Sequence, residues 1–166
     1  MNLVTTLAKA RAPSGLSPFR VARVDSGDRE LSYRVACPCG AETGTIISEY
    51  VADGQFWADP LDYDCVACGF SAVLFDSRKD GYDAVLNDFS ANLLRTKDEP
   101  VTCATCGSKA HKILASYRYD LEDEEVEDDW DTERRQQMPD VFTSAVFELT
   151  CGQCGEAQWL ADFECA

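Results

Sequence analysis

Eight of the nine cysteines in this 166-residue chain fall into four close pairs. Each pair is followed directly by glycine, and the pairs are Cys37-Pro-Cys39-Gly40, Cys65-Val-Ala-Cys68-Gly69, Cys103-Ala-Thr-Cys106-Gly107 and Cys151-Gly-Gln-Cys154-Gly155. A turn of this kind presents two thiolates to one cation, and its glycine can adopt the positive φ that closes the loop. Two such turns supply the four ligands of a tetrahedral Zn²⁺ site. The pattern therefore predicts two zinc ions per chain.

Loop length favours pairing each turn with its neighbour in the sequence, although pairing across the chain stays open. The predicted ligands of the first ion are Cys37, Cys39, Cys65 and Cys68, and those of the second are Cys103, Cys106, Cys151 and Cys154. The first turn departs from the others because one residue, not two, separates its cysteines. Iron in a rubredoxin-like site uses the same four-sulfur geometry and remains an alternative metal. The lone His111 and the unpaired Cys165 are not expected to be ligands.

The segments between the cysteine pairs favour β-strands, as in Thr45–Tyr50 and Ser144–Leu149. The chain also reads as a tandem duplication. Aligning Cys39 with Cys106 and Cys68 with Cys154 brings the glycines and several apolar residues into one shared register. The second half differs by an acidic insertion over residues 120–138, since 25 residues separate Cys39 from Cys65 but 44 separate Cys106 from Cys151.

Apolar residues at helical spacing between the halves predict an amphipathic helix over Gly81 to Arg95, followed by a linker over Thr96 to Pro100. Asn2 to Ala10 favours a short helix that Pro13-Ser14-Gly15 ends. The predicted organisation is a basic N-terminal arm over residues 1–30, a first zinc ribbon over 31–78, a connecting helix and linker over 79–100, and a second zinc ribbon over 101–166. The arm is expected to be solvated or loosely docked.

The knuckles Cys65-Val-Ala-Cys68-Gly69 and Cys151-Gly-Gln-Cys154-Gly155 resemble those of the zinc-ribbon group, over roughly residues 33–76 and 101–163. The resemblance implies two β-hairpin turns that clamp each metal. It indicates a small metal-stabilised, β-rich fold of two tandem zinc-ribbon-like β units joined by an amphipathic helix. Zinc ribbons serve many functions, so the resemblance alone selects none.

Composition narrows the class of protein. The formal charge is −15, from 30 acidic and 15 basic residues. Such a surface repels nucleic acid and attracts basic partners, although it can also serve solubility alone. The sequence contains no apolar run of about 20 residues that could span a membrane and no secretory signal, so a cytoplasmic location is expected. In a reducing compartment, a cysteine density this high favours metal binding over disulfides.

The insertion carries the strongest candidate for partner binding. Between Asp120 and Glu133 most positions are carboxylates, and an aromatic residue is set among them. The predicted partner-binding residues are Glu122, Asp123, Glu124, Glu125, Glu127, Asp128, Asp129, Trp130 and Asp131. Carboxylates would steer a basic partner, and an exposed Trp130 would anchor it. The alternative is a solvated loop with no binding role.

No catalytic constellation stands out in the sequence. Catalytic zinc keeps an open position and uses histidine or carboxylate, whereas two complete four-cysteine sites leave none open. The expected function is therefore a non-catalytic zinc protein whose acidic surface engages a basic protein partner, such as a nucleic-acid enzyme or toxin that it inhibits. Two alternatives remain, a zinc-ribbon accessory factor of transcription, translation or RNA processing, and a rubredoxin-like electron carrier. Direct nucleic-acid binding and membrane association are not expected.

Overall fold

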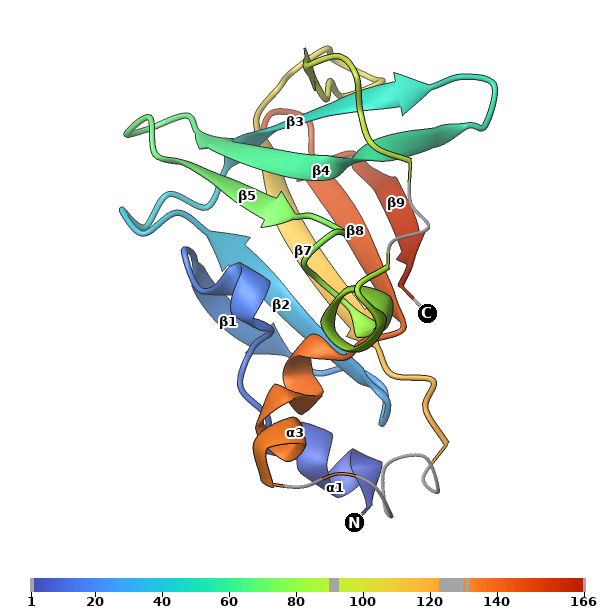
Figure 1. Cartoon of the computed structure of the whole chain (residues 1–166). Coiled ribbons are helices and arrows are strands. Elements are labelled where there is room, and N and C mark those ends of the chain that lie inside the picture. The colour runs from blue at the N-terminus through green and yellow to red at the C-terminus, as the bar shows by residue number, and fades with distance from the viewer. Residues whose placement is uncertain (1, 90–92, 123–129, 131, 166) are drawn as a thin grey trace.

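The computed structural model describes residues 2–89, 93–122, 130 and 132–165, and these form a β-rich fold with a few short helical segments (Figure 1). The strands are β1 (Arg20–Val24), β2 (Glu30–Ala36), β3 (Gly44–Val51), β4 (Phe56–Cys65), β5 (Ser71–Phe75), β6 (Glu99–Pro100), β7 (His111–Arg118), β8 (Ser144–Cys151) and β9 (Ala157–Glu164). The helical segments are α1 (Leu3–Ala8), η1 (Ser14–Leu16), η2 (Asp83–Asn87), α3 (Thr132–Gln137) and η3 (Met138–Asp140). The strands expected at Thr45–Tyr50 and Ser144–Leu149 are confirmed.

The strands form two antiparallel layers that share one sheet. One layer has the order β1-β2-β7-β8-β9 and the other the order β6-β3-β4-β5. They meet where Gly44 pairs with His111. A Cβ added at Gly44 would lie 2.0 Å from a ring carbon of Tyr63, so only glycine fits at this crossing point. Figure 1 shows β3 and β4 crossing over the ends of β7 and β8.

The strand register supports the predicted duplication. Gly44 pairs with Cys65 in one half, and the equivalent His111 pairs with Cys151 in the other. The register of β4 on β5 also shifts just after Leu61, and that of β8 on β9 shifts at the equivalent place, just after Phe147. A β-bulge conserved between two halves of one chain at the same position indicates that β3–β5 and β7–β9 repeat one unit.

The two halves exchange their first strands. β2 precedes the first cysteine turn but pairs with β7 of the second half, placing Arg34 opposite Leu114. β6 precedes the third turn but pairs with β3 of the first half, placing Pro100 opposite Ile47. These two contacts are equivalent in the aligned halves. Each repeat therefore completes the sheet of the other.

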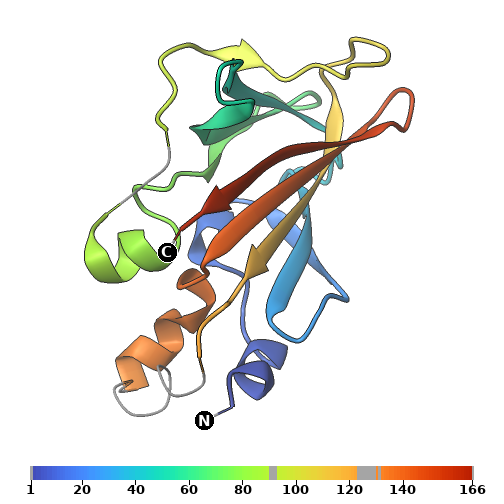
Figure 2. The ribbon, with the colours of Figure 1, turned by 90° about the vertical axis from the view of Figure 1, so that its right-hand side faces the viewer.

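One hydrophobic core runs through both layers and the helical segments. Phe75 of β5 stacks on Phe163 of β9, with ring centroids 4.6 Å apart, and contacts Phe147 of β8 at 5.5 Å. These aromatic contacts join the first repeat to the second, since offset pairs at such distances are favourable. Figure 2 shows η2 and α3 on one side of β7–β9.

The N-terminal arm is docked rather than loose. α1 begins after Asn2, whose side chain accepts the Thr5 N–H and so caps the helix. Leu3, Leu7 and Leu16 are each at most 1% exposed. The Arg23 guanidinium donates to the carbonyls of Leu7 and Ala8, which fixes the helix end against β1.

The long amphipathic helix predicted over Gly81 to Arg95 is not confirmed. Of the described residues in this segment, only Asp83–Asn87 form a helical element, a single π turn, and Asp88 has a left-handed conformation with φ of 53° that ends it. Residues 90–92 lie outside the described part of the chain. Val85 and Leu86 pack on the core as predicted, but Phe89 is 59% exposed. Val85 and Leu86 therefore lie on one helical turn in the described residues, and not on the long helix that was predicted.

Candidate metal centres

The four cysteine turns are called knuckles 1 to 4 in chain order. Knuckles 2, 3 and 4 share one backbone pattern. In knuckles 2, 3 and 4 the first cysteine N–H donates to the carbonyl five residues later, at 2.8 Å in each case. The glycine N–H donates back to the carbonyl of that first cysteine, at 2.8 to 3.1 Å. All of these glycines have φ between 73° and 77°, in the left-handed region. The positive φ predicted for these glycines is confirmed.

Knuckle 1 makes the same turn with one residue fewer. The Cys37 N–H donates to the Ala41 carbonyl at 3.0 Å, and the Gly40 N–H donates to the Cys37 carbonyl at 2.8 Å. Gly40 has φ of 95°. The shorter Cys37-Pro38-Cys39 spacing therefore still aims both sulfurs to one side.

The structure brings the eight predicted ligands into two groups. Within each group all four sulfurs lie within 4.8 Å of one another, and the groups are Cys37, Cys39, Cys65 and Cys68, and Cys103, Cys106, Cys151 and Cys154. Neighbouring knuckles thus pair locally, as predicted. In each knuckle the first cysteine is buried and the second is exposed. Each group could hold one metal ion at the edge of the core.

The spacing of the sulfurs fits a tetrahedral zinc ion. Four ligands at 2.3 Å from a zinc ion lie about 3.8 Å apart. Sulfur–sulfur distances between facing knuckles are 3.8 Å for Cys39–Cys65 and 3.5 Å for Cys37–Cys68, Cys103–Cys154 and Cys106–Cys151. Backbone N–H groups also point at the sulfurs, from Ala67 to Cys65 and from Gln153 to Cys151, each at 3.4 Å. Such N–H donors disperse thiolate charge and orient metal ligands.

One thiol in each group is acidified. Burial opposes ionisation of Cys65, but N–H donors from Cys68 and Ala67 and neighbouring thiols outweigh it and lower its pKa to about 6. N–H donors from Cys154 and Gln153, against a smaller effect of burial, lower the pKa of Cys151 to about 6. Burial raises the pKa of Cys37 to about 12. Each group therefore offers one thiolate readily, and a metal ion would displace the remaining protons.

His111 and Cys165 lie outside both groups. His111 is fully buried where the two layers meet, with Nδ1 3.2 Å from the Lys109 carbonyl, and burial lowers its pKa. Cys165 packs against Gly81, and its backbone carbonyl accepts the Asp83 N–H. Burial, and next the nearby Asp80, raise the pKa of the Cys165 thiol to about 12. Both residues therefore contribute to packing.

The structure corrects one predicted partner-binding residue. Trp130 is 8% exposed and belongs to the hydrophobic core, as does Leu121 at 5%. Trp130 therefore offers no exposed anchor to a partner, because its large apolar ring is stabilised by burial in the core. Glu122 is exposed, while Asp123, Glu124, Glu125, Glu127, Asp128, Asp129 and Asp131 lie outside the described residues.

An acidic recess lies beside Asp120, where the insertion begins. It has a volume of 390 Å³ and is lined by Arg118, Asp120, Thr143, Ser144, Asp162 and Glu164. Its one cation, Arg118, already pairs with Glu30 at 3.4 Å. The other charged groups that line the recess are three carboxylates, those of Asp162 and Glu164 on β9 and of Asp120 after β7.

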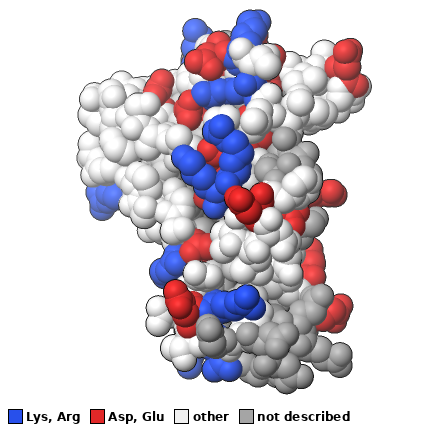
Figure 3. Space-filling view, in the orientation of Figure 1, with Lys and Arg blue, Asp and Glu red and all other residues white. Residues whose placement is uncertain are grey.

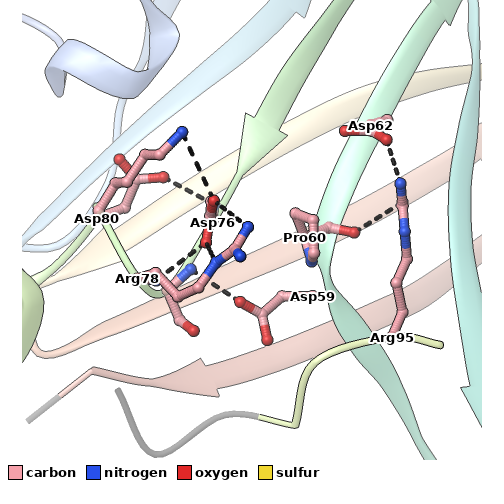
Figure 4. Close-up of polar contacts among 9 residues, drawn as sticks. Asp59, Pro60, Asp62, Asp76, Arg78, Asp80 and Arg95 are labelled. Carbon is pink, nitrogen blue, oxygen red and sulfur yellow. Dashed lines mark hydrogen bonds and ion pairs between the residues drawn. The ribbon is translucent and has the colours of Figure 1, made fainter. Parts of the chain in front are cut away.

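Two groups of polar contacts, one around Asp76 and one around Arg95, were missed by sequence reasoning (Figure 4). Asp76 is 2% exposed in its side chain and accepts from the Arg78 N–H and guanidinium. Asp59 is fully buried and accepts the Ser77 N–H at 2.8 Å. Arg95 donates to the carbonyls of Ile47 and Pro60 and pairs with Asp62.

On the face in Figure 3, basic side chains gather in a band interleaved with acidic ones.

No protein-family model, curated protein or solved structure matches this chain. Among the described residues, no helix is both long and apolar enough to cross a membrane. The two four-cysteine groups are consistent with tandem zinc-ribbon-like units, and the assignment rests on their geometry.

Proposed function

We propose that this chain is a two-zinc protein that binds a basic protein partner and performs no catalysis of its own. The observation that carries the proposal is the pair of four-cysteine groups, each with four sulfurs within 4.8 Å of one another. A four-thiolate zinc ion contributes folding free energy and leaves no position for substrate. Among the described residues, no third cluster of His, Cys, Asp or Glu side chains converges in this way.

The charge of the molecule supports the partner class. The formal charge of −15 favours association with cationic surfaces, since a strong field of one sign speeds encounter with the opposite sign. The acidic recess provides a place where cationic side chains of a partner would be held. A basic cleft that binds phosphate, such as that of a nucleic-acid enzyme or toxin, has the matching charge. Covering that cleft would inhibit its activity.

The metal part of the proposal is tested by elemental analysis of the purified full chain. Two zinc ions per chain, colourless protein and no disulfide among the eight cysteines are expected. A red, iron-bearing sample would replace zinc with a rubredoxin-like metal. One metal or none per folded chain would overturn the assignment of two sites.

The partner part is tested with two matched triple variants of equal charge. The first variant removes the three carboxylates of the acidic recess and is Asp120→Asn/Asp162→Asn/Glu164→Gln. The second removes three exposed acids elsewhere and is Asp25→Asn/Asp28→Asn/Asp53→Asn. Proteins that copurify with each tagged variant are identified by mass spectrometry. A basic protein that is lost with the recess variant and kept with the control supports the proposal. A partner set that is the same for both variants would contradict it.

A further inference from the structure

An open groove crosses the solvent face of strands β1, β2, β7 and β8, on the side away from the core. Its volume is 670 Å³, within the range of small-molecule sites. The floor is largely apolar, from Ala22, Val24 and Leu114. The cationic lining residues are Arg20, Arg34 and Lys112, and the acidic ones are Glu42 and Glu148. No cysteine and no residue of the acidic recess lines the groove, although Gly40 of knuckle 1 does.

Two of the cations in the groove lack partners. No ion pair or hydrogen bond engages the guanidinium of Arg20 or Arg34 within the described part of the chain, whereas Arg11, Arg78, Arg95 and Arg118 all pair with carboxylates. Arg20 pairs in register with Ala36, and Arg34 with Ala22, so the two arginines are diagonal neighbours on one face. Like charges placed this close repel one another. Both arginines are exposed, so their guanidinium groups are accessible to an anion from solution.

Gly40 of knuckle 1 borders one of these guanidinium groups. A Cβ added at Gly40 would lie 3.2 Å from Nη1 of Arg20, so the glycine leaves room for the guanidinium. Lys112 adds a third positive charge, partly offset by Glu42 at 3.3 Å. The overall negative charge of the protein opposes this local field only weakly, because exposed charges beyond about 8 Å are screened at physiological salt.

The far side of the groove has the opposite character. Arg34, Leu114 and Glu148 face one another in register on β2, β7 and β8. Two strand spacings place Arg34 and Glu148 about 10 Å apart. An anionic group held by the arginines would thus be separated from the Glu148 carboxylate by an apolar stretch. Glu148 would accept a hydrogen bond from an N–H or O–H group at the other end of the ligand.

We infer that this groove binds a small organic phosphate of nucleotide-like build. The phosphate lies between Arg20 and Arg34, where planar guanidinium groups bind its oxygens in bidentate fashion. The uncharged body of the ligand covers Leu114, and a donor group on it reaches Glu148.

The experiment titrates the four nucleoside 5′-monophosphates into full-length, metal-loaded protein and follows backbone amides by NMR. Inorganic phosphate and the phosphate-free nucleosides are the comparison ligands. Shifts confined to β1, β2, β7 and β8 are expected for at least one monophosphate, with an affinity at least about tenfold above both comparison ligands. Arg20→Gln and Arg34→Gln should each weaken that affinity about tenfold. Lys9→Gln, an exposed cation outside the groove, should leave it unchanged.

Three outcomes would overturn the inference. The first is that no monophosphate shifts amides in these four strands at millimolar concentration. The second is that Arg20→Gln and Arg34→Gln bind the monophosphate as tightly as Lys9→Gln does. An identical thermal transition for all three variants would establish that each is folded in this comparison. The third is that a short single-stranded oligonucleotide binds far more tightly than any monophosphate, which would make the face a nucleic-acid interface.

Discussion

Each cysteine ligand is oriented by backbone bonds that close within five residues of it. In knuckles 2 to 4 the sulfur direction follows from two hydrogen bonds and one left-handed glycine. This is why spacing and residue type alone predicted both ligand groups. Trp130 lacks such local determinants, and its burial depends on what the rest of the chain packs against it. The sequence therefore predicted the sulfurs correctly and the tryptophan wrongly.

The knuckle glycines give the first prediction. Gly69 has φ of 74°, and a Cβ there would meet no atom within 4 Å, so Gly69→Ala adds backbone strain without a clash. We expect a loss of about 1 kcal/mol in the free energy of unfolding, since left-handed conformations cost L-residues that much. Gly27→Ala is the control, because Gly27 is equally open and has no positive φ. Urea denaturation of both variants measures the difference, and equal stability would contradict the role given to the left-handed turn.

Burial of Trp130 gives the second prediction. Trp130→Ala should lower the free energy of unfolding by about 3 to 5 kcal/mol, the usual cost of emptying a buried aromatic site. Trp159 is 64% exposed on β9, and Trp159→Ala should cost far less. Thermal denaturation compares the two tryptophan variants. Similar small losses for both would mean that Trp130 does not belong to the core.

At the scale of elements, sequence pattern predicted strands and missed how they are shared. The strands Thr45–Tyr50 and Ser144–Leu149 could be predicted because β-forming residues repeat locally. The exchange of β2 and β6 depends on contacts between residues more than fifty positions apart, such as Pro100 with Ile47. β6 has only two residues and offers no periodicity to read. The predicted helix over Gly81 to Arg95 failed because Asp88 reverses the chain after one turn.

Strand exchange predicts how loss of one metal site spreads. Cys65→Ser removes one thiolate from the first group, so the metal contribution to folding falls steeply there. Because β2 pairs with β7 and leads directly into knuckle 1, amide protection should fall in β7 and β8 as well as in β3 to β5. Hydrogen exchange of the variant checks this. Protection lost from β3 to β5 alone would show that the two repeats fold independently.

At the scale of the whole molecule, half-buried acids tie distant segments together. The Asp80 carboxylate accepts the Asp76 N–H, and Asp140 accepts the Ser14 N–H and pairs with Arg11. Burial, with a smaller opposing effect of the Asp76 N–H, raises the pKa of Asp80 to about 6; the charges of Asp76 and Asp140 add to the increase. Loops from the N-terminus, β5 and η3 thus meet around Asp80, whose negative charge is costly in this position.

Asp80 therefore makes stability depend on pH. Its folded pKa lies above its unfolded value, so the folded state binds the extra proton and stability falls as pH rises from about 4 to about 6. Asp80→Asn keeps an acceptor for the Asp76 N–H and removes the charge. We expect the variant to gain about 1 to 2 kcal/mol at pH 7.5 and about half as much at pH 5. Urea denaturation at both values checks it, and an equal gain at both would contradict the raised pKa.

Metal removal tests the molecule as one cooperative unit. The core runs from Leu3 to Cys165 through both layers, and the exchanged strands leave neither repeat with a complete sheet of its own. A structural zinc ion contributes on the order of 10 kcal/mol of apparent free energy, which is as large as the whole net stability of a typical domain. A strong chelator should therefore release two metal ions per chain and abolish the near-ultraviolet dichroism of the buried aromatics in a single transition. The same chelator saturated with zinc beforehand should change nothing. Two separate transitions, one per metal ion, would show that the shared core does not couple the sites.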